Sequence, residues 1–422
     1  MLIAVAKRFV GTCENWAMKI YSFVEGASAR RGGLGLVGVP KIARSLADRG
    51  HQVVLNVAGR VSPGAEQYVQ PDVKSAFHRE SGAGAFGIVT YPTFGGWAFA
   101  PSMLWTLRRH IGSIDFVTLH SLYSYPVLVG CLLARLYHKP YGLWPHGVLA
   151  PFQRRVSAGK KKVYDRLIGR CIINGAAVLF YSAVGEREEA RSLHLASPSV
   201  IIPHGVDLQE YGQLPTRGDF RAKLLGGHRG PLVLFLSRLN AKKGLHILTQ
   251  AFSLVSQQMP EARLAIVGNG DPPQFESRVK GWLQECGIAG QAIMPGLLIG
   301  QEKLQAFADA DVFVLPSEAE NFGFAMFEAM ASRLPVVVSD TLNYADEIRR
   351  SQAGFVVRRD AREFASAILK LLRDPELRKR MGNNGLRMAQ GYSWQACGEK
   401  IDRTIQCVLQ GKALPADLTL GG

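Results

Sequence analysis

The chain has 422 residues, of which 47% are hydrophobic and 20% are charged, a composition that is typical of folded globular proteins and excludes a largely disordered chain. At this length, two ordinary domains with substantial cores are expected. The formal net charge of +16 indicates an anionic partner, such as a nucleotide, a phosphorylated acceptor or an acidic membrane surface.

The sequence patterns argue against nucleic acid as that partner. They contain no zinc-finger spacing, no ribonucleoprotein aromatic motif and no basic heptad helix, so we expect no nucleic-acid binding. The six cysteines include no C-x-x-C pair. This dispersal argues for a reducing compartment and against a metal site.

The first predicted strand is MKIYSFVE, which opens at Met18. Residues 1–17 contain a short apolar run followed by Lys7 and Arg8, which is the wrong order of charge for a secretory signal. We therefore expect residues 1–17 to be an extension upstream of the true start.

A glycine-containing loop follows this strand and precedes a predicted helix and a second strand, HQVVLNVA. Gly33, Gly35 and Gly38 spell G-x-G-x-x-G, the dinucleotide fingerprint. The fingerprint's first glycine normally follows the strand directly, whereas about eight residues intervene here, and the second strand ends without a ribose-binding acid. We therefore predict that Gly33 and Gly35 let the backbone approach a ligand.

The segment KPYGLWPHGVLAPF ends a predicted strand with Pro145, His146 and Gly147. A single histidine after a strand is more often structural than catalytic. Because the pKa of imidazole lies near working pH, however, a neutral His146 can exchange hydrogen bonds with a ligand hydroxyl group. We predict a functional role for His146 without assigning proton transfer to it.

A basic segment follows and contains one acid, Asp165. Its cations are Arg154, Arg155, Lys160, Lys161, Lys162, Arg166 and Arg170. Such runs are usually solvated, but Leu167 and Ile168 among the cations allow a basic amphipathic helix on an anionic membrane surface. No segment is predicted to span a membrane, because the most apolar candidate contains Pro126 and is interrupted by Arg135.

The pattern of strands and linkers predicts where the domains begin and end. The stretch after Asp207 is polar and glycine-rich and is expected to link two domains. The predicted parts are an N-terminal domain over 1–208, a C-terminal domain over 217–388, a returning helix over 389–413 and a tail over 414–422.

In the second domain, Arg238 and Lys243 lie between a buried strand, PLVLFLS, and an amphipathic helix, GLHILTQAF. Fixed cations after a strand favour an anionic group such as a diphosphate. The next strand runs into a Gly-Asn-Gly turn that puts Gly268 at a strand's carboxyl end, where nucleotides tend to bind. A simple tight turn explains that glycine equally well.

The segment PSEAENFGFAMFEAMASRLPVVVSD, residues 316–340, carries the strongest functional signal. It sets Glu320 and Glu328 on either side of Gly323, between two apolar strands of a predicted parallel sheet. A helix start near Phe324 offers free N–H groups to an anion such as a diphosphate. A carboxylate would repel that anion, so both glutamates are interpreted as partners of hydroxyl groups, and the implied ligand is a nucleotide sugar.

Glu320 and Glu328, with seven residues between them, resemble the E-x7-E signature of family-4 retaining glycosyltransferases, which have the GT-B fold. Arg238 and Lys243 are similar to the family's R-x4-K-G pair, and His146 to the histidine of its P-H-G segment. The resemblance covers nearly the whole chain after residue 17. It implies an α/β protein with two Rossmann-like domains facing each other across a cleft and a C-terminal helix crossing back to the first domain.

The resemblance also implies roles for individual residues. The predicted catalytic residues are Arg238 and Lys243, which would hold the leaving diphosphate, Glu320, which would contact the donor sugar, and His146. The predicted donor-binding residues are Glu328, expected at the ribose, and Asn321, Phe322, Gly323, Phe324, Gly33, Gly35 and Gly268. No metal and no other cofactor are expected, because the cations supply the electrostatic stabilisation, and Asp309-Ala310-Asp311, which mimics a D-x-D metal motif, is predicted to be structural.

One position departs from the family pattern. Where the family usually has a glycine before Leu-Pro, this chain has Arg333. A long cationic side chain there is expected to alter how the end of the helix packs.

The resemblance, together with these patterns, implies a retaining hexosyltransferase that uses a nucleotide-sugar donor and a saccharide or lipid-linked saccharide acceptor, in cell-envelope or exopolysaccharide biosynthesis. We expect a cytoplasmic location, peripheral on the inner face of the plasma membrane through the segment from Arg154 to Arg170. The alternatives are a GT-B epimerase or phosphorylase, a nicotinamide-dependent oxidoreductase built on the Gly33, Gly35 and Gly38 fingerprint, and a non-catalytic, membrane-associated scaffold.

Overall fold

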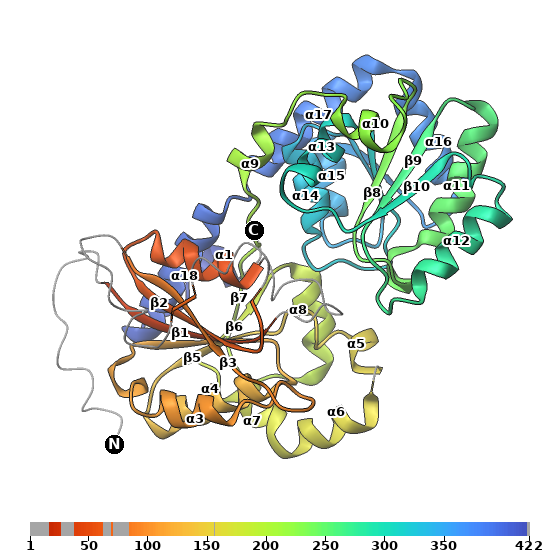
Figure 1. Cartoon of the computed structure of the whole chain (residues 1–422). Coiled ribbons are helices and arrows are strands. Elements are labelled where there is room, and N and C mark those ends of the chain that lie inside the picture. The colour runs from red at the N-terminus through yellow and green to blue at the C-terminus, as the bar shows by residue number, and fades with distance from the viewer. Residues whose placement is uncertain (1–16, 27–37, 62–68, 71–83, 156, 420–422) are drawn as a thin grey trace. The chain divides into compact units, whose positions relative to one another are not determined.

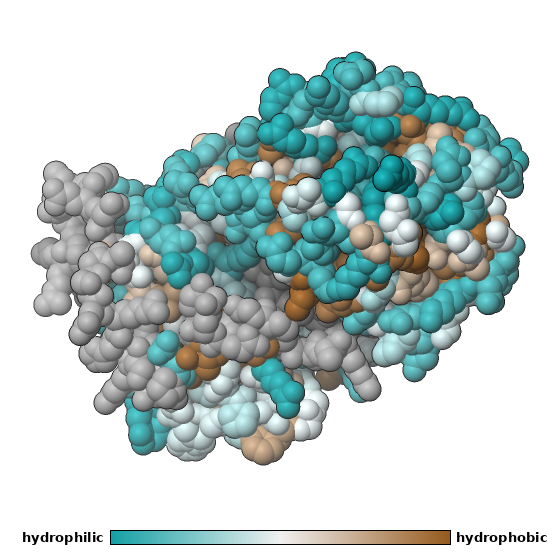
Figure 2. Space-filling view, turned by 45° about the horizontal axis from the view of Figure 1, so that its top comes forward, coloured by the Kyte–Doolittle hydropathy of each residue, from teal (hydrophilic) through white to brown (hydrophobic). Residues whose placement is uncertain are grey.

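The computed structural model describes residues 17–26, 38–61, 69–70, 84–155 and 157–419 (Figure 1). These residues form two compact units. The N-terminal unit contains the described residues up to His204 together with those from Trp394 onward, and the C-terminal unit spans Gly205–Ser393. Hydrophilic residues form most of the surface that is visible in Figure 2.

The N-terminal unit is built on a parallel sheet with the strand order β3-β2-β1-β4-β5-β6-β7. Its strands are β1 (Lys19–Glu25), β2 (Gln52–Ala58), β3 (Phe86–Tyr91), β4 (Phe116–His120), β5 (Tyr141–Trp144), β6 (Val178–Tyr181) and β7 (Ser199–Ile201). The order reverses between β1 and β4, as in a Rossmann fold, where ligands bind at the carboxyl ends of the strands beside the reversal.

Helices cover both faces of this sheet because alternate residues of each strand point to opposite sides. The helical elements are α1 (Gly38–Ala47), α3 (Pro101–Leu107), η2 (Ile111–Ser113), α4 (Tyr125–Leu136), α5 (Pro151–Arg155), α6 (Ala158–Tyr164), η3 (Asp165–Gly169), α7 (Arg170–Asn174), α8 (Val184–Ala190), η4 (Arg191–Leu193), α18 (Trp394–Leu409) and α19 (Ala416–Thr419). In β1, Tyr21 and Phe23 share a core with α3 and α4, whereas Ile20 and Val24 share one with α1 and α18.

The chain's last described elements differ from the prediction. The expected helix over 389–413 is divided, because α17 ends at Gln390 and only α18, from Trp394, packs on α1 in the N-terminal unit. The predicted tail is wrong for residues 416–419, which form α19. Leu418 of this helix is buried in the same core as α18, so the segment is fixed by apolar contact.

The C-terminal unit has a second parallel sheet, with the order β10-β9-β8-β11-β12-β13. Its strands are β8 (Leu232–Leu236), β9 (Arg263–Val267), β10 (Ala292–Gly296), β11 (Val312–Leu315), β12 (Val336–Ser339) and β13 (Gly354–Val357). The order again reverses once, between β8 and β11. The loops that leave these two strands therefore mark the expected ligand site of this unit.

The helical elements of the C-terminal unit precede, connect and follow these strands. They are α9 (Leu208–Gly212), α10 (Asp219–Leu224), η5 (Ala241–Lys243), α11 (Leu245–Gln258), α12 (Phe275–Glu285), α13 (Gly300–Asp309), α14 (Phe324–Ala331), α15 (Ala345–Ser351), α16 (Ala361–Arg373) and α17 (Pro375–Gln390). The segments at the start and the end of this unit lie side by side, because the backbone N–H of Val206 donates to the carbonyl of Tyr392 at 2.8 Å.

Arg333 ends α14 in the left-handed backbone region, with a φ of 59°. This conformation explains why glycine suits the position, since a side chain there is strained by about 1 kcal/mol or more. The Arg333 guanidinium donates to the side-chain oxygen of Asn383 at 3.2 Å, and its carbonyl packs against Gly382 of α17, where a Cβ would approach it to 2.0 Å.

Replacing Arg333 with glycine is expected to raise the free energy of unfolding by about 1 kcal/mol, because it relieves the left-handed strain and removes only an exposed hydrogen bond. Urea unfolding of Arg333→Gly and the parent protein measures this gain. Ser332→Gly is the matched control, since Ser332 has a φ of −81° and gains nothing from glycine. An unchanged or lowered stability of Arg333→Gly would contradict the strain.

Candidate active site

The candidate site of the C-terminal unit lies where the strand order reverses. The loop after β8 contacts the loop after β11 through backbone, because the N–H of Glu318 donates to the carbonyl of Lys242 at 2.7 Å. Gly244 has a φ of 65°, and a Cβ on it would approach the Pro316 carbonyl oxygen to 2.1 Å. Only glycine allows this approach, which brings the side chain that precedes it, Lys243, to the second loop.

Lys243 and Glu320 form an ion pair across these two loops. Their side chains are only 11% and 13% exposed, so water screens the pair much less than it screens a surface pair. Glu320 also accepts a hydrogen bond from the Ser317 hydroxyl at 2.8 Å. The structure therefore brings together Lys243, which is predicted to bind the diphosphate, and Glu320, which is predicted to bind the sugar. Their opposite charges balance each other.

The loop that carries Glu320 is held by Ser339, the last residue of β12, and by Asn343, which follows this strand. The Ser339 hydroxyl donates to the Ser317 carbonyl at 2.7 Å. The Asn343 side-chain amide donates to the carbonyls of Glu320 and Asn321 at 2.9 and 3.2 Å. These bonds fix the backbone of the loop, so the position of the Glu320 carboxylate does not depend on its own ion pair alone.

Gly323 begins α14 in the left-handed region, with a φ of 82°. The amides of Met326 and Phe327 bond to its carbonyl, whereas the amides of a helix's first residues have no partner within the helix. Together with the helix dipole they favour an anion at this end of α14. The backbone of Gly323 and Phe324 thus lies where the sequence predicted donor contacts.

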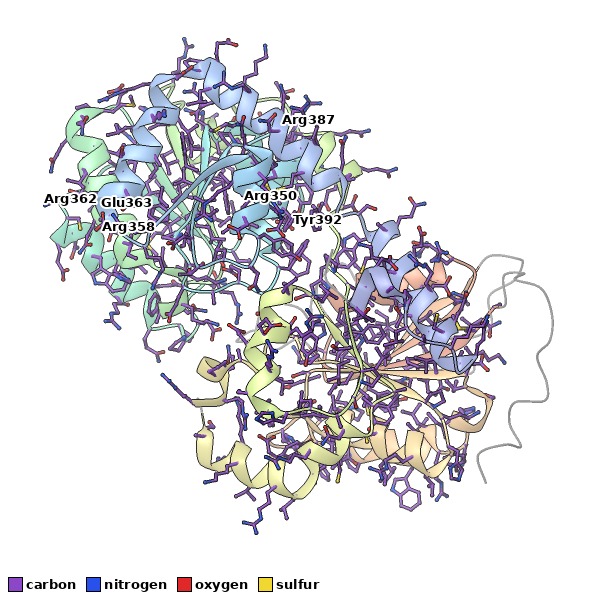
Figure 3. All side chains as sticks on the ribbon, turned by 180° about the vertical axis from the view of Figure 1, so that it is seen from behind. Arg350, Arg358, Arg362, Glu363, Arg387 and Tyr392 are labelled. Atoms are coloured by element: carbon purple, nitrogen blue, oxygen red, sulfur yellow. The ribbon has the colours of Figure 1, made fainter. Side chains whose placement is uncertain are left out.

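The side chain of Phe322 does not belong to this surface. Its ring is 2% exposed, stacks on Phe327 at 4.2 Å and contacts Tyr344 and Tyr392; Tyr392 is labelled in Figure 3. The sequence placed Phe322 among the donor-binding residues, but burial of its ring leaves only its backbone for a ligand. In this glycine-containing segment, the sequence pattern alone does not distinguish a residue of the hydrophobic core from a residue of the binding site.

Glu328 lies further along α14 and has partners of its own. Its carboxylate is 3.2 Å from the ammonium group of Lys303 in α13. Burial, followed by the nearby Glu328 carboxylate, raises the pKa of Tyr211 in α9 far above its usual range. Sequence reasoning missed Lys303 and Tyr211, because nothing in their local sequence distinguishes them from a solvated lysine and a linker aromatic.

Arg238 is separate from these pairs. It is half-exposed and forms an ion pair with Asp271 at 2.8 Å, and within the described part of the chain it has no hydrogen bond or ion pair with Lys243, Glu320 or Glu328. Gly268, with a φ of 136°, lies against the Ser237 carbonyl, which a Cβ would approach to 1.9 Å. Contact between neighbouring strand ends therefore explains this glycine without a ligand.

In the N-terminal unit, His146 lies in a stack of rings at the carboxyl ends of the strands. Its Nε2 is 3.0 Å from Nδ1 of His120, the last residue of β4, and its ring stacks on Trp144 and His204. His146 has a φ of 53°, and the following Gly147 donates its N–H to the buried Glu186 carboxylate at 2.6 Å. The turn that presents His146 is thus held by Glu186.

These histidines are neutral at ordinary pH. Burial, with a contribution from His204, lowers the pKa of His120 to about 3, and burial lowers that of His204 to about 3. Burial and its two histidine neighbours hold the pKa of His146 well below its usual range. A neutral imidazole has one donor and one acceptor nitrogen, so the bond between His120 and His146 requires that one of the two facing nitrogens carries hydrogen and the other does not.

Two family models match the chain. The model described as Glycosyl transferases group 1 matches residues 216–388. The model described as Glycosyltransferase Family 4 matches residues 37–210. The matches indicate a family-4 glycosyltransferase of the GT-B fold.

The chain is similar in sequence to proteins that are named as transferases. Phosphatidyl-myo-inositol mannosyltransferase of Mycobacterium leprae is 28% identical over 327 residues, which cover 74% of this chain and 78% of that protein. Sulfoquinovosyl transferase SQD2 of Arabidopsis thaliana is 31% identical over 225 residues, which cover 52% of this chain and 42% of that protein. This chain therefore spans less than half of the plant relative.

Solved structures confirm the predicted fold class of two Rossmann-like domains with parallel sheets. The complex of Anabaena Alr3699/HepE with UDP and glucose has a TM-score of 0.73 at 18% identity, covering 92% of this chain and 99% of that one. WaaG, a glycosyltransferase involved in lipopolysaccharide biosynthesis, has a TM-score of 0.65 at 16% identity, covering 92% and 99%. At such identities the comparison shows the fold alone.

The remaining predicted residues of this glycosyltransferase do not extend the site. Gly33 and Gly35 lie outside the described residues. Asp309 is fully buried and accepts hydrogen bonds from the backbone of Gly218 and Arg221, and Asp311 forms an ion pair with Arg221 at 3.0 Å. Both carboxylates of the D-x-D-like triplet thus hold α10 at the junction between α13 and β11.

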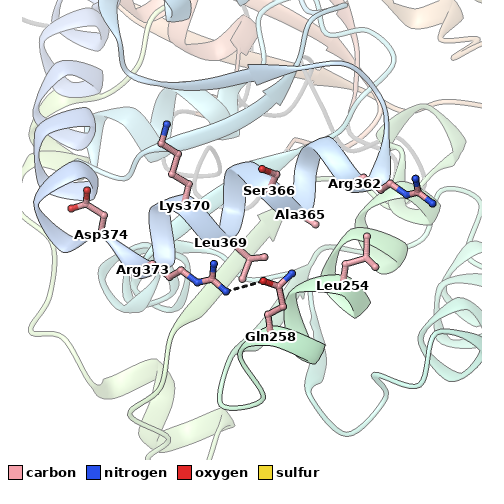
Figure 4. Close-up of a pocket in the computed structure, with 9 residues that line it drawn as sticks. All are labelled: Leu254, Gln258, Arg362, Ala365, Ser366, Leu369, Lys370, Arg373 and Asp374. Carbon is pink, nitrogen blue, oxygen red and sulfur yellow. Dashed lines mark hydrogen bonds between the residues drawn. The ribbon is translucent and has the colours of Figure 1, made fainter.

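The described ranges contain no site for a metal ion and no membrane-spanning helix. They hold no group of three or more histidine, cysteine or acidic side chains placed to bind a metal ion, and no helix in them has the length and apolarity needed to cross a bilayer. A surface groove between α11 and α16 contains none of the candidate residues (Figure 4). Its one drawn hydrogen bond joins Arg373 to Gln258 at 2.8 Å.

Proposed function

We propose that this glycosyltransferase moves a sugar from a nucleotide diphosphate sugar to a saccharide or lipid-linked saccharide acceptor, with retention at the anomeric carbon. The Lys243–Glu320 ion pair at the strand reversal of the C-terminal sheet carries the proposal. It sets a cation for a diphosphate beside a carboxylate for sugar hydroxyl groups, next to the anion-favouring start of α14. The resemblance to the E-x7-E family supports retention.

Departure of the nucleoside diphosphate is the step that these residues would assist. Negative charge builds on the leaving group as the glycosidic bond breaks, and fixed positive groups at that place lower the barrier. Lys243 would supply one such charge from within the protein, and Arg238, oriented by Asp271, a second one. The backbone amides at the start of α14, at Gly323 and Phe324, would add hydrogen bonds. This arrangement assigns no step to a metal ion.

The two glutamates would hold the two sugars of the donor. Glu320 would contact the transferred sugar, either as a nucleophile or as an orienting group, and its contact with Ser317 limits its movement. Glu328 would accept hydrogen bonds from the ribose hydroxyl groups, with the ion pair to Lys303 holding the carboxylate in place. His146, as a neutral imidazole, would bond a hydroxyl group on the reaction side.

The acceptor class and the location are inferred from the names of similar proteins. The names of two similar proteins contain an inositol lipid or an inositol phosphate, which supports an acceptor with an anionic, lipid-linked or phosphorylated group. We accordingly place the enzyme in cell-envelope or exopolysaccharide biosynthesis, in the cytoplasm and peripheral to the membrane. The family matches do not favour the alternatives, which are an epimerase, a phosphorylase, an oxidoreductase and a non-catalytic scaffold.

A thermal-shift screen tests the donor class. The purified protein is heated with UDP-, GDP- and ADP-sugars and with NADH as the contrasting ligand. A rise in the melting temperature with one class of nucleotide sugar is expected, because a ligand that binds only the folded state stabilises it by mass action. A response to NADH alone would favour the oxidoreductase, and turnover of the donor without a sugar acceptor would favour the epimerase.

Replacing Glu328 with alanine is expected to weaken binding of the responding nucleotide by about 1–3 kcal/mol, the loss of charge-assisted hydrogen bonds to the ribose. Calorimetric titration of Glu328→Ala measures this loss. Glu318→Ala is the matched control, since Glu318 is an exposed acid in the loop that precedes α14. Unchanged affinity in a Glu328→Ala protein that melts normally without ligand would remove Glu328 from the site.

A further inference from the structure

One surface of the N-terminal unit combines unpaired cations, exposed apolar side chains and exposed aromatic rings. Its scaffold is the helical run α6, η3 and α7, from Ala158 to Asn174, in which Asp165 and Arg170 keep helical backbone angles at the junctions (Figure 1, yellow). The middle segment, η3, is a π-helix closed by the bond from the Arg170 N–H to the Asp165 carbonyl. Such segments are rare and frequently mark functional sites.

Three exposed cations follow one face of this run at intervals of four residues: Lys162, Arg166 and Arg170. Residues at this spacing are neighbours on a helix, and like charges there repel and destabilise it. No carboxylate of the described chain lies within ion-pair distance of these three side chains. Their repulsion is therefore uncompensated within the described structure and would be relieved by an external anion.

The cations also border a surface depression between α5 and the helical run. Its lining includes the three cations above and a further three, Arg154, Arg155 and Lys161. The one acid in the lining, Asp165, already accepts hydrogen bonds from Arg154 at 3.0 Å and from the Tyr123 hydroxyl at 3.3 Å. Six cations thus face one engaged carboxylate, which makes the depression strongly electropositive.

An apolar stripe runs beside the cationic one. Val163 and Leu167 each follow a cation of the stripe by one position and are 59% and 69% exposed. Cys171 continues the stripe after one more turn and is also exposed. Exposure of aliphatic side chains to water is unfavourable in free energy. A helical run with adjacent cationic and apolar stripes is typical of segments that lie in a membrane interface.

The loop after β3 adds aromatic rings to the same surface. Phe94, Trp97 and Phe99 are 61%, 43% and 42% exposed. Trp97 and Ala98 both have left-handed backbone angles, with φ of 64° and 53°, so the fold keeps a strained loop that leaves aromatic rings exposed. The ring of Trp97 contacts that of Tyr164 in α6 at 6.2 Å, which joins the loop to the helical run.

We propose that the helical run Ala158–Asn174 and the loop Phe94–Phe99 form a docking surface for an anionic lipid bilayer. The cations would contact phosphate headgroups, whose negative potential attracts basic segments. Val163, Leu167 and Phe94 would enter the boundary of the acyl chains, where aromatic side chains are also favoured. This surface deepens the proposed function, since an enzyme held there can reach a lipid-linked acceptor.

Vesicle flotation of the full chain tests the surface, with phosphatidylcholine vesicles that contain or lack phosphatidylglycerol. The parent protein is expected to float with the anionic vesicles only. The triple variant Lys162→Glu, Arg166→Glu, Arg170→Glu is expected to lose about tenfold or more of its partitioning. The control variant Lys280→Glu, Lys379→Glu, Arg380→Glu has the same change of charge on exposed positions of the C-terminal unit and is expected to float like the parent.

A second variant, Phe94→Ser with Val163→Ser and Leu167→Ser, separates insertion from charge attraction. It is expected to float several-fold less than the parent even at low salt, whereas an unchanged partition would overturn the insertion of the apolar stripe and loop. Equal flotation of the two charge variants would overturn the docking surface itself. Since the thermal-shift response to nucleotide sugars is measured without vesicles, failure of the donor assignment is distinguishable from failure of the surface.

Discussion

Replacement of Lys243 with glutamine is expected to lower turnover by about 100- to 1,000-fold, the range found when one group that stabilises developing negative charge is removed. Lys243 is the most enclosed cation of the candidate site, and it is held beside Glu320 by backbone contact between two loops. A charge in that position needs no rearrangement as the diphosphate departs. Glutamine keeps the length and polarity of the side chain but not the charge.

The measurement is the initial rate of sugar transfer, or of donor hydrolysis where the acceptor is not yet known, with the nucleotide sugar found by the thermal-shift screen. Lys242→Gln is the matched control, because Lys242 is the adjacent lysine on the same short helix. A rate for Lys243→Gln within threefold of this control would contradict a role in leaving-group stabilisation. The double variant Lys243→Gln, Glu320→Gln shows whether loss of the pair, rather than of the charge, alters folding.

The strands that flank the candidate site could be predicted from the sequence, because the apolar runs and glycines that mark them are encoded locally. The apolar runs before Arg238 and before Glu320 are β8 and β11, and the glycines that follow mark the loops. The pairing of Lys243 with Glu320 was not predictable in this way. It depends on the adjacency of β8 and β11 and on Gly244 fitting under the Pro316 carbonyl, which are long-range properties of the sheet.

The residues that sequence reasoning missed share a physical cause. Lys303 and Tyr211 meet Glu328 only after α9 and α13 pack against α14, and His120 and His204 meet His146 only because β4, β5 and β7 end at the same edge of one sheet. Phe322 presents the opposite case. Its neighbours in sequence belong to the site, but its ring packs in the aromatic core.

A polar cluster in the N-terminal unit ties α18 to the turn between α1 and β2. Asp402 of α18 accepts hydrogen bonds from Arg49 at 2.9 Å and from Gln406 at 2.8 Å, and it lies 3.1 Å from Nε2 of His51. Nδ1 of His51 accepts from the backbone N–H of Met18 at 3.2 Å, so Nε2 is the nitrogen that carries hydrogen toward Asp402. Asp402 and His51 are both nearly fully buried.

Replacing Asp402 with asparagine is therefore expected to lower the free energy of unfolding by about 3 kcal/mol, because it leaves buried donors without their charged acceptor. Urea unfolding at neutral pH measures the loss. Glu399→Gln is the matched control, since Glu399 is an exposed acid of the same helix and is expected to change stability little. A loss in Asp402→Asn no larger than that of the control would show that apolar contacts alone hold α18.

The same cluster gives this stabilisation a defined pH dependence. Burial alone would raise the pKa of Asp402, but the hydrogen bonds from His51 and Arg49 outweigh burial and lower it below its ordinary value of 3.8. A carboxyl group whose pKa is lower in the folded state stabilises the fold at every pH above its unfolded pKa, and this contribution is lost as the pH falls through the folded pKa. The stability difference between the parent and Asp402→Asn is thus expected to be constant from neutral pH down to about pH 5 and to shrink below about pH 4. A difference that stays unchanged down to about pH 3 would contradict stabilisation by an ionised Asp402 carboxylate.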